Sequence, residues 1–325
     1  MLLLTMTALA LASYQQGVAT PRPPRPPRAP LVEVPRVHVD VSVDRDDGSD
    51  DDGPMRGTTD TSIAVQKGVR LSVDNFSGHI TVVGWEQDKV RIKTGAGDAS
   101  GVDVSGGTVT LRVSGNGGRW GDQDDHDITL SVPTWMELDL SGNEVDIDVS
   151  GVGGSVRAET VEGTVSLTGG DGNISLKSVD GDITISGAKG RIGLNTVEGE
   201  IRATDIAGDL DVQSVDGEIT LERVDSRSVT ASSVDGGIRF SGPINAGGVY
   251  HLESHDGDVV LLTDGPPDAV MSISTFDGEF ESDYPVTVTG ANSNRRMTFT
   301  LGSGKARVEL QTFDGKISLR RAPAR

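Results

Sequence analysis

From residue 61 onwards the chain consists of short runs in which apolar and polar residues alternate. Such runs lie at residues 69–73 (VRLSV), 109–113 (VTLRV) and 128–132 (ITLSV), with glycine between many of them. An alternation with a period of two places every second side chain on one face, as in a strand that buries one side. No segment sustains an apolar period of 3.6 residues. The pattern therefore predicts many short strands and almost no helix.

Between residues 154 and 217 a glycine recurs at every ninth position. Apolar residues stand two and four places after each glycine, as Ile183 and Ile185 do after Gly181. Positions i and i+2 of a strand share a face, so each nine-residue unit predicts one short strand with two inward side chains. Glycine supplies the positive φ that a sharp corner requires. The repeating glycines are Gly154, Gly163, Gly172, Gly181, Gly190, Gly199, Gly208 and Gly217.

A longer repeat is superimposed on the nine-residue one. A phrase of hydroxyl residue, valine, acid and glycine begins at Thr160, Ser178, Thr196 and Ser214, eighteen positions apart, and again at Ser233, one residue late. A single repeat cannot bury its apolar face, so repeats must stack into an array. The sequence thus predicts an all-β fold: a single-stranded parallel β-solenoid (β-helix) of about 18 residues per coil, made from paired nine-residue units, with irregular ends.

The chain divides into five segments. Residues 1–12 (MLLLTMTALALA) predict a signal peptide, because the apolar run is too short to span a bilayer and ends in a small-x-small motif, although no Lys or Arg precedes it. Residues 13–60 predict a disordered linker, first proline-rich in the polyproline II conformation and then acidic. Residues 61–150 should form an irregular β part of the solenoid, residues 151–242 the regular solenoid, and residues 243–325 longer coils and a cap.

Composition limits the classes of molecule that the chain can bind. The chain has a formal net charge of −20, 43 glycines and no cysteine. A strongly acidic protein lacks the basic face that nucleic acid requires, and without cysteine it has no thiol chemistry. We therefore expect no nucleic-acid partner, no integral membrane span and no cofactor. The charge is compatible with divalent cations bound weakly, or with a basic polymer or protein of the cell envelope.

The acid of the repeated phrase predicts a charged column. Stacked coils would place these carboxylates about 4.8 Å apart, where neighbours repel by roughly 1 kcal/mol in water. The column could hold cations or a basic polymer. The simpler interpretation, which surface charge generally favours, is that Asp-Gly corners serve turn geometry and stay solvated. The candidate binding residues are Glu162, Asp180, Glu198, Asp216, Asp235, Asp256 and Asp277, with Asp314 as a further member.

Other candidate sites are weaker. A calcium-binding β-roll is rejected, because it requires an aspartate where the second residue after each glycine is aliphatic here. The loop at residues 120–127 (WGDQDDHD), which includes His126, could bind a metal or a substrate, but a solvated loop is the commoner outcome. A cluster of His251, His255, Asp256 and Asp258 is a weak metal candidate, because two histidines four apart in a strand do not share a helix face. Trp85 and Trp135, two of the three tryptophans, are expected to pack rather than to bind sugars.

Several motifs together resemble the bacterial putative-adhesin β-strand-repeat domain family. They are residues 71–82 (LSVDNFSGHITV) followed by Gly84-Trp85, the pair Val132-Pro133, the repeated V-[DE]-G-x-[IV] units, and residues 280–286 (FESDYPV) followed by 298–302 (TFTLG). The resemblance covers about residues 60 to 325. It implies an exported β-solenoid and carries no established catalytic residues.

Three functions follow as hypotheses. The first is a non-catalytic exported solenoid for adhesion or envelope interaction, located in the periplasm, the cell envelope or outside the cell. The second is a carbohydrate-active β-helix enzyme, which the sequence disfavours because coils with almost no insertions leave little room for a cleft. The third is a self-assembling envelope scaffold.

Overall fold

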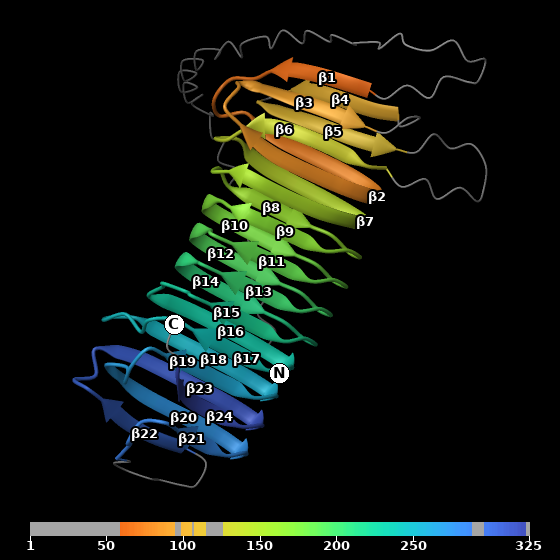
Figure 1. Cartoon of the computed structure of the whole chain (residues 1–325). Helices are drawn as coiled ribbons and strands as arrows, with labels where there is room; N and C mark the ends of the chain where they lie inside the picture. Colours follow the sequence, from red (N-terminus) through yellow and green to blue (C-terminus); the bar gives the residue numbers. More distant parts are fainter. Residues whose placement is uncertain (1–58, 95–98, 106, 115–125, 288–295, 323–325) are drawn as a thin grey trace, which may run out of the picture. The chain divides into compact units, whose positions relative to one another are not determined.

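The computed structural model describes residues 59–94, 99–105, 107–114, 126–287 and 296–322, all of them within one compact unit from Val37 to Arg325 (Figure 1). Every element in these ranges is a β-strand, as the alternating pattern predicts. This part of the chain accordingly contains no helix that could cross a membrane. The predicted signal peptide and nearly all of the predicted linker lie outside the described residues.

Two parallel ladders of strands form the regular part. The first ladder contains β8 (Val156–Glu159), β10 (Asp171–Lys177), β12 (Lys189–Asn195), β14 (Ala207–Gln213), β16 (Ser228–Asp235) and β18 (Val249–Asp256). The second contains β9 (Val165–Gly169), β11 (Ile183–Ser186), β13 (Ile201–Thr204), β15 (Ile219–Glu222), β17 (Ile238–Ser241) and β19 (Val259–Thr263). Two consecutive strands, one in each ladder, form what we call a rung.

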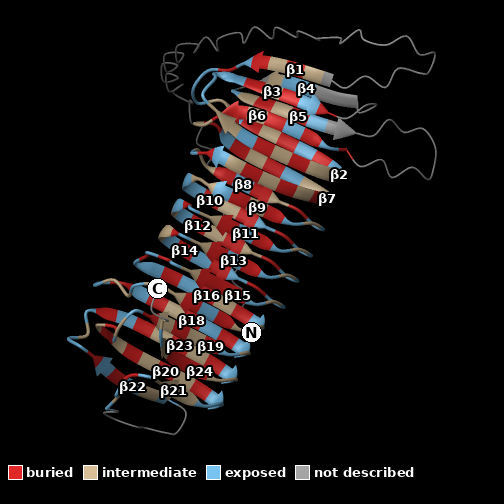
Figure 2. Cartoon of the chain, in the orientation of Figure 1, coloured by how far each residue is buried: buried red, intermediate tan, exposed pale blue. Residues whose placement is uncertain are grey.

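The register stacks like residues on like. In the first ladder Ile174 pairs with Ile192, which pairs with Leu210, and each partner is eighteen positions along the chain. Leu210 then pairs with Val229, nineteen positions on, where the chain carries its extra residue. The inward apolar residues of both ladders are buried in one continuous core (Figure 2). The predicted parallel stacking is therefore confirmed.

The hydroxyl and glycine of the repeated phrase build the corner between the ladders. Gly199 has a φ of 134°, and a Cβ added there would lie 2.4 Å from the carbonyl oxygen of Gly181 on the preceding rung. The buried Thr196 donates its Oγ1 hydrogen to the same carbonyl at 3.2 Å. A positive φ and a close backbone approach both require glycine, so stacked corners explain why the residue recurs.

At the N-terminal end, two long strands take part in both ladders. β2 (Arg70–Trp85) lies between β7 (Glu137–Val152) on one side and β5 (Thr108–Ser114) with β6 (Ile128–Pro133) on the other. β4 (Ala99–Ser105) then pairs antiparallel with β5, and β3 (Lys89–Thr94) with β6, while β1 (Thr59–Ala64) pairs antiparallel with β3. Antiparallel strands thus cover this end of the array.

The C-terminal end departs from chain order. The last strands, β23 (Ala306–Asp314) and β24 (Ile317–Arg321), insert between β18–β19 and the earlier pair β20 (Ala269–Asp277) and β21 (Phe280–Ser282). β22 (Arg296–Leu301) pairs antiparallel with β20 at the outer side. Parallel stacking thus gives way to antiparallel pairs at both ends, where the sequence predicts irregular structure and where strand edges require cover.

Asp268 fastens the turn that returns the chain to β23. Its Oδ1 accepts hydrogen bonds from the backbone N of Ser303 at 2.6 Å and from the Ser303 Oγ at 3.1 Å, and its Oδ2 lies 3.2 Å from the Lys305 Nζ. Desolvation opposes ionisation, but the bonds from Ser303 and Lys305 outweigh it and lower the pKa of Asp268 to about 2. The folded protein therefore favours the ionised carboxylate.

The melting temperature should accordingly depend on pH through this residue. A pKa lower in the folded than in the unfolded chain stabilises the fold above the unfolded value of about 3.9, and that contribution is lost as pH falls from about 4 to about 2. The difference in melting temperature between wild type and Asp268→Asn should therefore shrink across this range. Asp264→Asn, at an exposed carboxylate nearby, is the control; a constant difference for Asp268→Asn would contradict the assignment.

Candidate functional site: an acidic and apolar edge

The structure brings the predicted carboxylates together in one column. Bridge pairs join Glu162 to Asp180, Asp180 to Glu198, Glu198 to Asp216, and Asp216 to Asp235. Beyond them, the column continues in an order that the sequence did not suggest, because the inserted rung places Asp314 between Asp256 and Asp277. Glu144, which pairs with Glu162, extends the other end and was missed, since no glycine follows it.

The carboxylates of this acidic column have no partner within the described residues. All of them are exposed, and none makes a side-chain hydrogen bond or an ion pair there. The backbone forms the corner instead: the N of Glu198 donates to the Val179 oxygen at 2.8 Å, and the Glu198 oxygen accepts from the N of Gly181 at 2.9 Å. The side-chain charge is therefore not needed for turn geometry, and it faces solvent on a fixed backbone.

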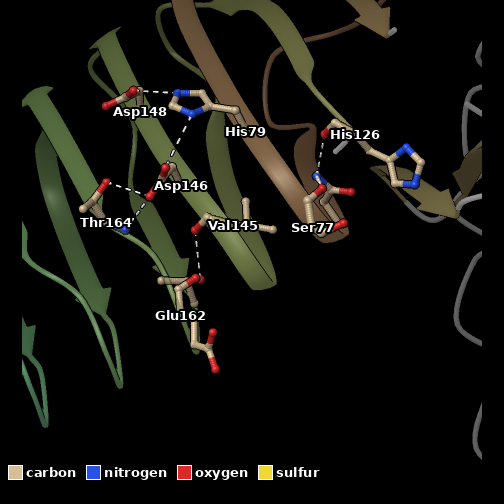
Figure 3. Close-up of polar contacts among 10 residues, drawn as sticks. Ser77, His79, His126, Val145, Asp146, Asp148, Glu162 and Thr164 are labelled. Atoms are coloured by element: carbon tan, nitrogen blue, oxygen red, sulfur yellow. Dashed lines mark hydrogen bonds and ion pairs between the residues drawn. The ribbon is translucent and has the colours of Figure 1, made fainter. Parts of the chain in front are cut away.

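A second acidic set lies directly after several corners, and sequence reasoning missed it. Asp182 accepts a hydrogen bond at 2.7 Å from the backbone N of Glu200 on the next rung, and Asp146 accepts bonds from the N (2.7 Å) and Oγ1 (2.9 Å) of Thr164. Figure 3 shows the contacts between Asp146 and Thr164. It also shows His79, whose Nε2 lies 2.7 Å from an oxygen of Asp148. These carboxylates brace neighbouring rungs. The acids that directly follow Gly181, Gly199 and Gly217 were the signal available in the sequence.

An exposed apolar column runs beside the acidic column. It contains the valine of each phrase, which is 46% exposed at Val179 and 52% at Val234. By the same register, His255, Phe313 and Phe276 continue it over the last rungs. The rings of His255 and Phe313 stack with centroids 4.9 Å apart, and those of Phe313 and Phe276 at 4.6 Å. The apolar column consists of Val161, Val179, Val197, Val215, Val234, His255, Phe313 and Phe276.

The two histidines of the predicted second cluster have different surroundings. His251 lies on the outer face of β18, where its Nε2 is 3.1 Å from Glu253 and its Nδ1 3.4 Å from Glu309. His255 instead stacks on Phe313 at the edge. Across the described ranges, no group of three or more His, Cys, Asp or Glu side chains is arranged to hold a metal ion. Weak cation binding by the acidic column stays a prediction.

The remaining candidates take structural positions. His126 is buried and its backbone N donates to the Ser77 oxygen at 3.3 Å, whereas residues 120–125 of the same predicted loop lie outside the described ranges. Trp85 donates its Nε1 hydrogen to the Lys89 carbonyl at 2.7 Å. Trp135 donates to Asp88 at 2.9 Å and packs against the core. Trp135 therefore packs as expected, and for Trp85 packing stays a prediction.

The surface of the described residues includes two hollows. One, of about 500 Å³, lies on the outer face of the first ladder above Gly193 and is lined by Arg157, Ser175 and Arg191 among others. The Arg157 guanidinium there already pairs with Asp139 and Glu159. The other, of about 360 Å³, lies at the N-terminal start of the acidic column beside His79 and Glu144. No residue of the acidic column or of the apolar column lines the first hollow, so this hollow is a separate surface.

Comparison with known proteins identifies a family. The sequence profile described as Toastrack DUF4097 matches residues 55–246 and, in a second overlapping match, residues 171–320. No curated protein matches the chain. Similar solved structures include proteins named as a putative adhesin from Parabacteroides distasonis (10% identity, 82% of this chain and 97% of that chain, TM-score 0.45) and one from Bacteroides fragilis (13% identity, 82% and 98%, TM-score 0.40). A protein from Parabacteroides distasonis named as a putative lipid binding protein is 11% identical, with a TM-score of 0.40; the match covers 82% of this chain and 97% of that chain.

Proposed function

The chain belongs to the Toastrack DUF4097 family, and from its surface we propose that it is a non-catalytic, exported β-solenoid with 18-residue coils that binds a basic polymer or protein of the cell envelope. The binding surface is the acidic column, from Glu144 to Asp277. No established catalytic residues come with the family resemblance, and export rests on the apolar segment at residues 1–12.

One observation carries the proposal: the carboxylates of the acidic column are aligned, exposed and unpartnered on a backbone that the corner hydrogen bonds already fix. Holding like charges in neighbouring rungs costs about 1 kcal/mol per pair in water. A basic partner would relieve that repulsion at every rung. Because the display is rigid, little conformational freedom would be lost when it binds.

The test compares two sets of charge-neutralising substitutions. Saturable binding of the full chain to an isolated envelope fraction should be lost in the triple variant Asp180→Asn, Glu198→Gln, Asp216→Asn. It should persist in the matched control Asp139→Asn, Asp209→Asn, Asp211→Asn, which removes the same charge from the outer face of the first ladder. Equal losses in both would show a general effect of net charge and would contradict the assignment to the column.

The same preparation tests the rival functions. Turnover on a panel of polysaccharides, retained in the triple variant, would favour a carbohydrate-active enzyme instead. Concentration-dependent assembly of the purified chain without any envelope fraction would favour a self-assembling scaffold.

A further inference from the structure

The apolar column is unusual for a solvent-exposed edge. Its valines leave about half of each side chain in water, at every rung from Val161 to Val234, and half-exposed Phe313 and Phe276 continue the line. Scattered apolar residues are normal on surfaces, but a continuous apolar line bordered by charge marks a binding site. The acid and the glycine of each corner already form backbone hydrogen bonds to neighbouring rungs, as Glu198 and Gly181 do, which favours a partner that binds these side chains over one that adds a strand there.

The adjoining acidic column defines the charge of that partner. Each exposed valine is followed directly by an exposed carboxylate, as Val179 is by Asp180 and Val215 by Asp216. Consecutive Cα atoms are about 3.8 Å apart, so one narrow ligand can contact both columns. A ligand that fits must therefore present an apolar side and a cationic side along its whole length.

The spacing of the rungs selects the conformation of the partner. Stacked strands are about 4.8 Å apart, so every second carboxylate recurs at about 9.6 Å. A polyproline II helix has three residues per turn and rises about 3.1 Å per residue, which gives about 9.3 Å per turn. In a β-strand, side chains on one face recur about every 6.6 Å, which matches neither the spacing of neighbouring carboxylates nor that of every second carboxylate. A left-handed helix with a cation at every third residue keeps in step.

The ring stack supports the same partner. Grooves that bind polyproline II segments are lined with aromatic side chains, on which proline rings pack. The rings of Phe313 and Phe276 stack with their planes 4° from parallel, and their exposed parts offer an aromatic surface at one end of the apolar column. Arginine guanidinium groups also stack on aromatic faces and pair with carboxylates. Proline and arginine together match both columns.

We propose that the acidic and apolar columns together bind a basic, proline-rich polypeptide of a partner protein, in the polyproline II conformation with Arg or Lys at every third position. The cations contact every second carboxylate of the acidic column, and the prolines lie on the valines and on the phenylalanine stack. This inference rests on the proposed function and names the class of its partner.

The experiment uses a fluorescent peptide of about twelve residues built from Pro-Pro-Arg triplets, which would span about 37 Å. Its binding to the full chain is followed by fluorescence anisotropy at about 50 mM and about 500 mM salt. We expect saturable binding that weakens steeply with salt, as for exposed charge pairs. A peptide of the same composition whose arginines do not recur every third residue should bind about tenfold more weakly, and a Pro-Pro-Glu peptide should not bind.

Substitutions in each column separate the two contributions. The pair Val179→Ser, Val197→Ser should weaken peptide binding about tenfold without changing its salt dependence, whereas Val249→Ser, at a valine that is 51% exposed outside the column, should leave it unchanged. The pair Asp180→Asn, Glu198→Gln should weaken binding and flatten the salt dependence, and Asp209→Asn, Asp211→Asn should have a much smaller effect. A circular dichroism spectrum confirms that each variant is folded.

Several outcomes would overturn the inference. Equal binding of the regular and shuffled peptides would show that the three-residue spacing of the arginines does not matter. Binding that is unchanged by the valine substitutions would show that the apolar column does not contribute and that charge alone attracts the peptide. Binding of a basic polysaccharide such as a chitosan oligomer, without peptide binding, would assign the edge to a glycan. If the peptide fails while envelope binding still requires the acidic column, the proposed function stands and only the partner class falls; if envelope binding does not require the column, both fall.

The chain itself carries the same chemistry at residues 21–30 (PRPPRPPRAP), outside the described residues, where Arg22, Arg25 and Arg28 are three apart. The titration is therefore repeated with these three arginines changed to serine. Unchanged peptide affinity is expected for a partner from another protein. An increase of about tenfold would show that the chain's own segment competes for the surface, and would contradict an outside partner.

Discussion

Replacing Gly199 with alanine should lower the free energy of unfolding by about 4 kcal/mol. The φ of 134° costs an L residue roughly 2 kcal/mol, and the added Cβ would lie 2.4 Å from the Gly181 oxygen, an overlap worth about 2 kcal/mol more. The clash is with backbone that is itself hydrogen-bonded to the next rung, so it cannot move alone. Urea titration followed by far-ultraviolet circular dichroism measures the change.

Gly193 offers the matched control within one rung. Its φ is ordinary, and the nearest atom to an added Cβ is the Ile174 oxygen at 4.0 Å. Gly193→Ala should therefore be neutral, or stabilising by about 0.5 kcal/mol, because alanine restricts the unfolded chain. Trp85 and Trp135 fluorescence reports the N-terminal rungs, so a second transition by this probe would reveal stepwise unfolding. Equal costs at Gly193 and Gly199 would contradict a closely stacked corner.

Phe240→Ala should destabilise the protein by a similar amount, about 4 kcal/mol. The ring is fully buried and meets the Tyr250 ring edge-on, with centroids 5.8 Å apart. It stands in a ladder position that Leu221 and Leu261 occupy on the neighbouring rungs, so its removal leaves a cavity among residues held by the repeat. Thermal and urea unfolding should both report the loss.

Two further substitutions serve as comparisons for the cost of Phe240→Ala. Phe240→Leu restores the residue type of the adjacent rungs and should cost only about 1 kcal/mol. Phe76→Ala, at a ring that is 64% exposed, should cost well under 1 kcal/mol. A cost for Phe240→Leu as large as that of Phe240→Ala would mean that the aromatic pair, and not the filled volume, stabilises this rung.

The regular rungs could be predicted because equivalent positions in successive rungs have the same environment and therefore carry similar residues. An inward residue such as Ile183 lies against Ile201, and both sit at the same offset from a glycine that the corner needs. Periodicity therefore carries register, burial and corner geometry together. The ends could not be predicted this way, because antiparallel cover by β3, β4 and β22 arises from contacts between unlike segments, for which a repeat gives no signal.

The candidate site was predicted in part for the same reason. Alignment of Asp180 with Glu198 follows from the register, so the column appeared in the sequence. The exposure of Val179 did not, because valine beside a strand normally indicates burial, and only the corner turns it outward. The position of Asp314 within the column depends on an insertion of strands that no local pattern encodes.

The insertion of β23 and β24 has a consequence for how the protein folds as it is made. Ribosomes and export machinery deliver a chain from its N-terminus, and a simple repeat array could close each rung as it emerges. Here a later segment, β23 and β24, must enter between two strand pairs made earlier, so β20 and β21 cannot take their final place until the chain has reached Arg321. Until then β18 and β19 expose an open edge. The closing step thus waits for β23 and β24 to be made, and a product cut short before β23 would lose an interior layer and not an outer one.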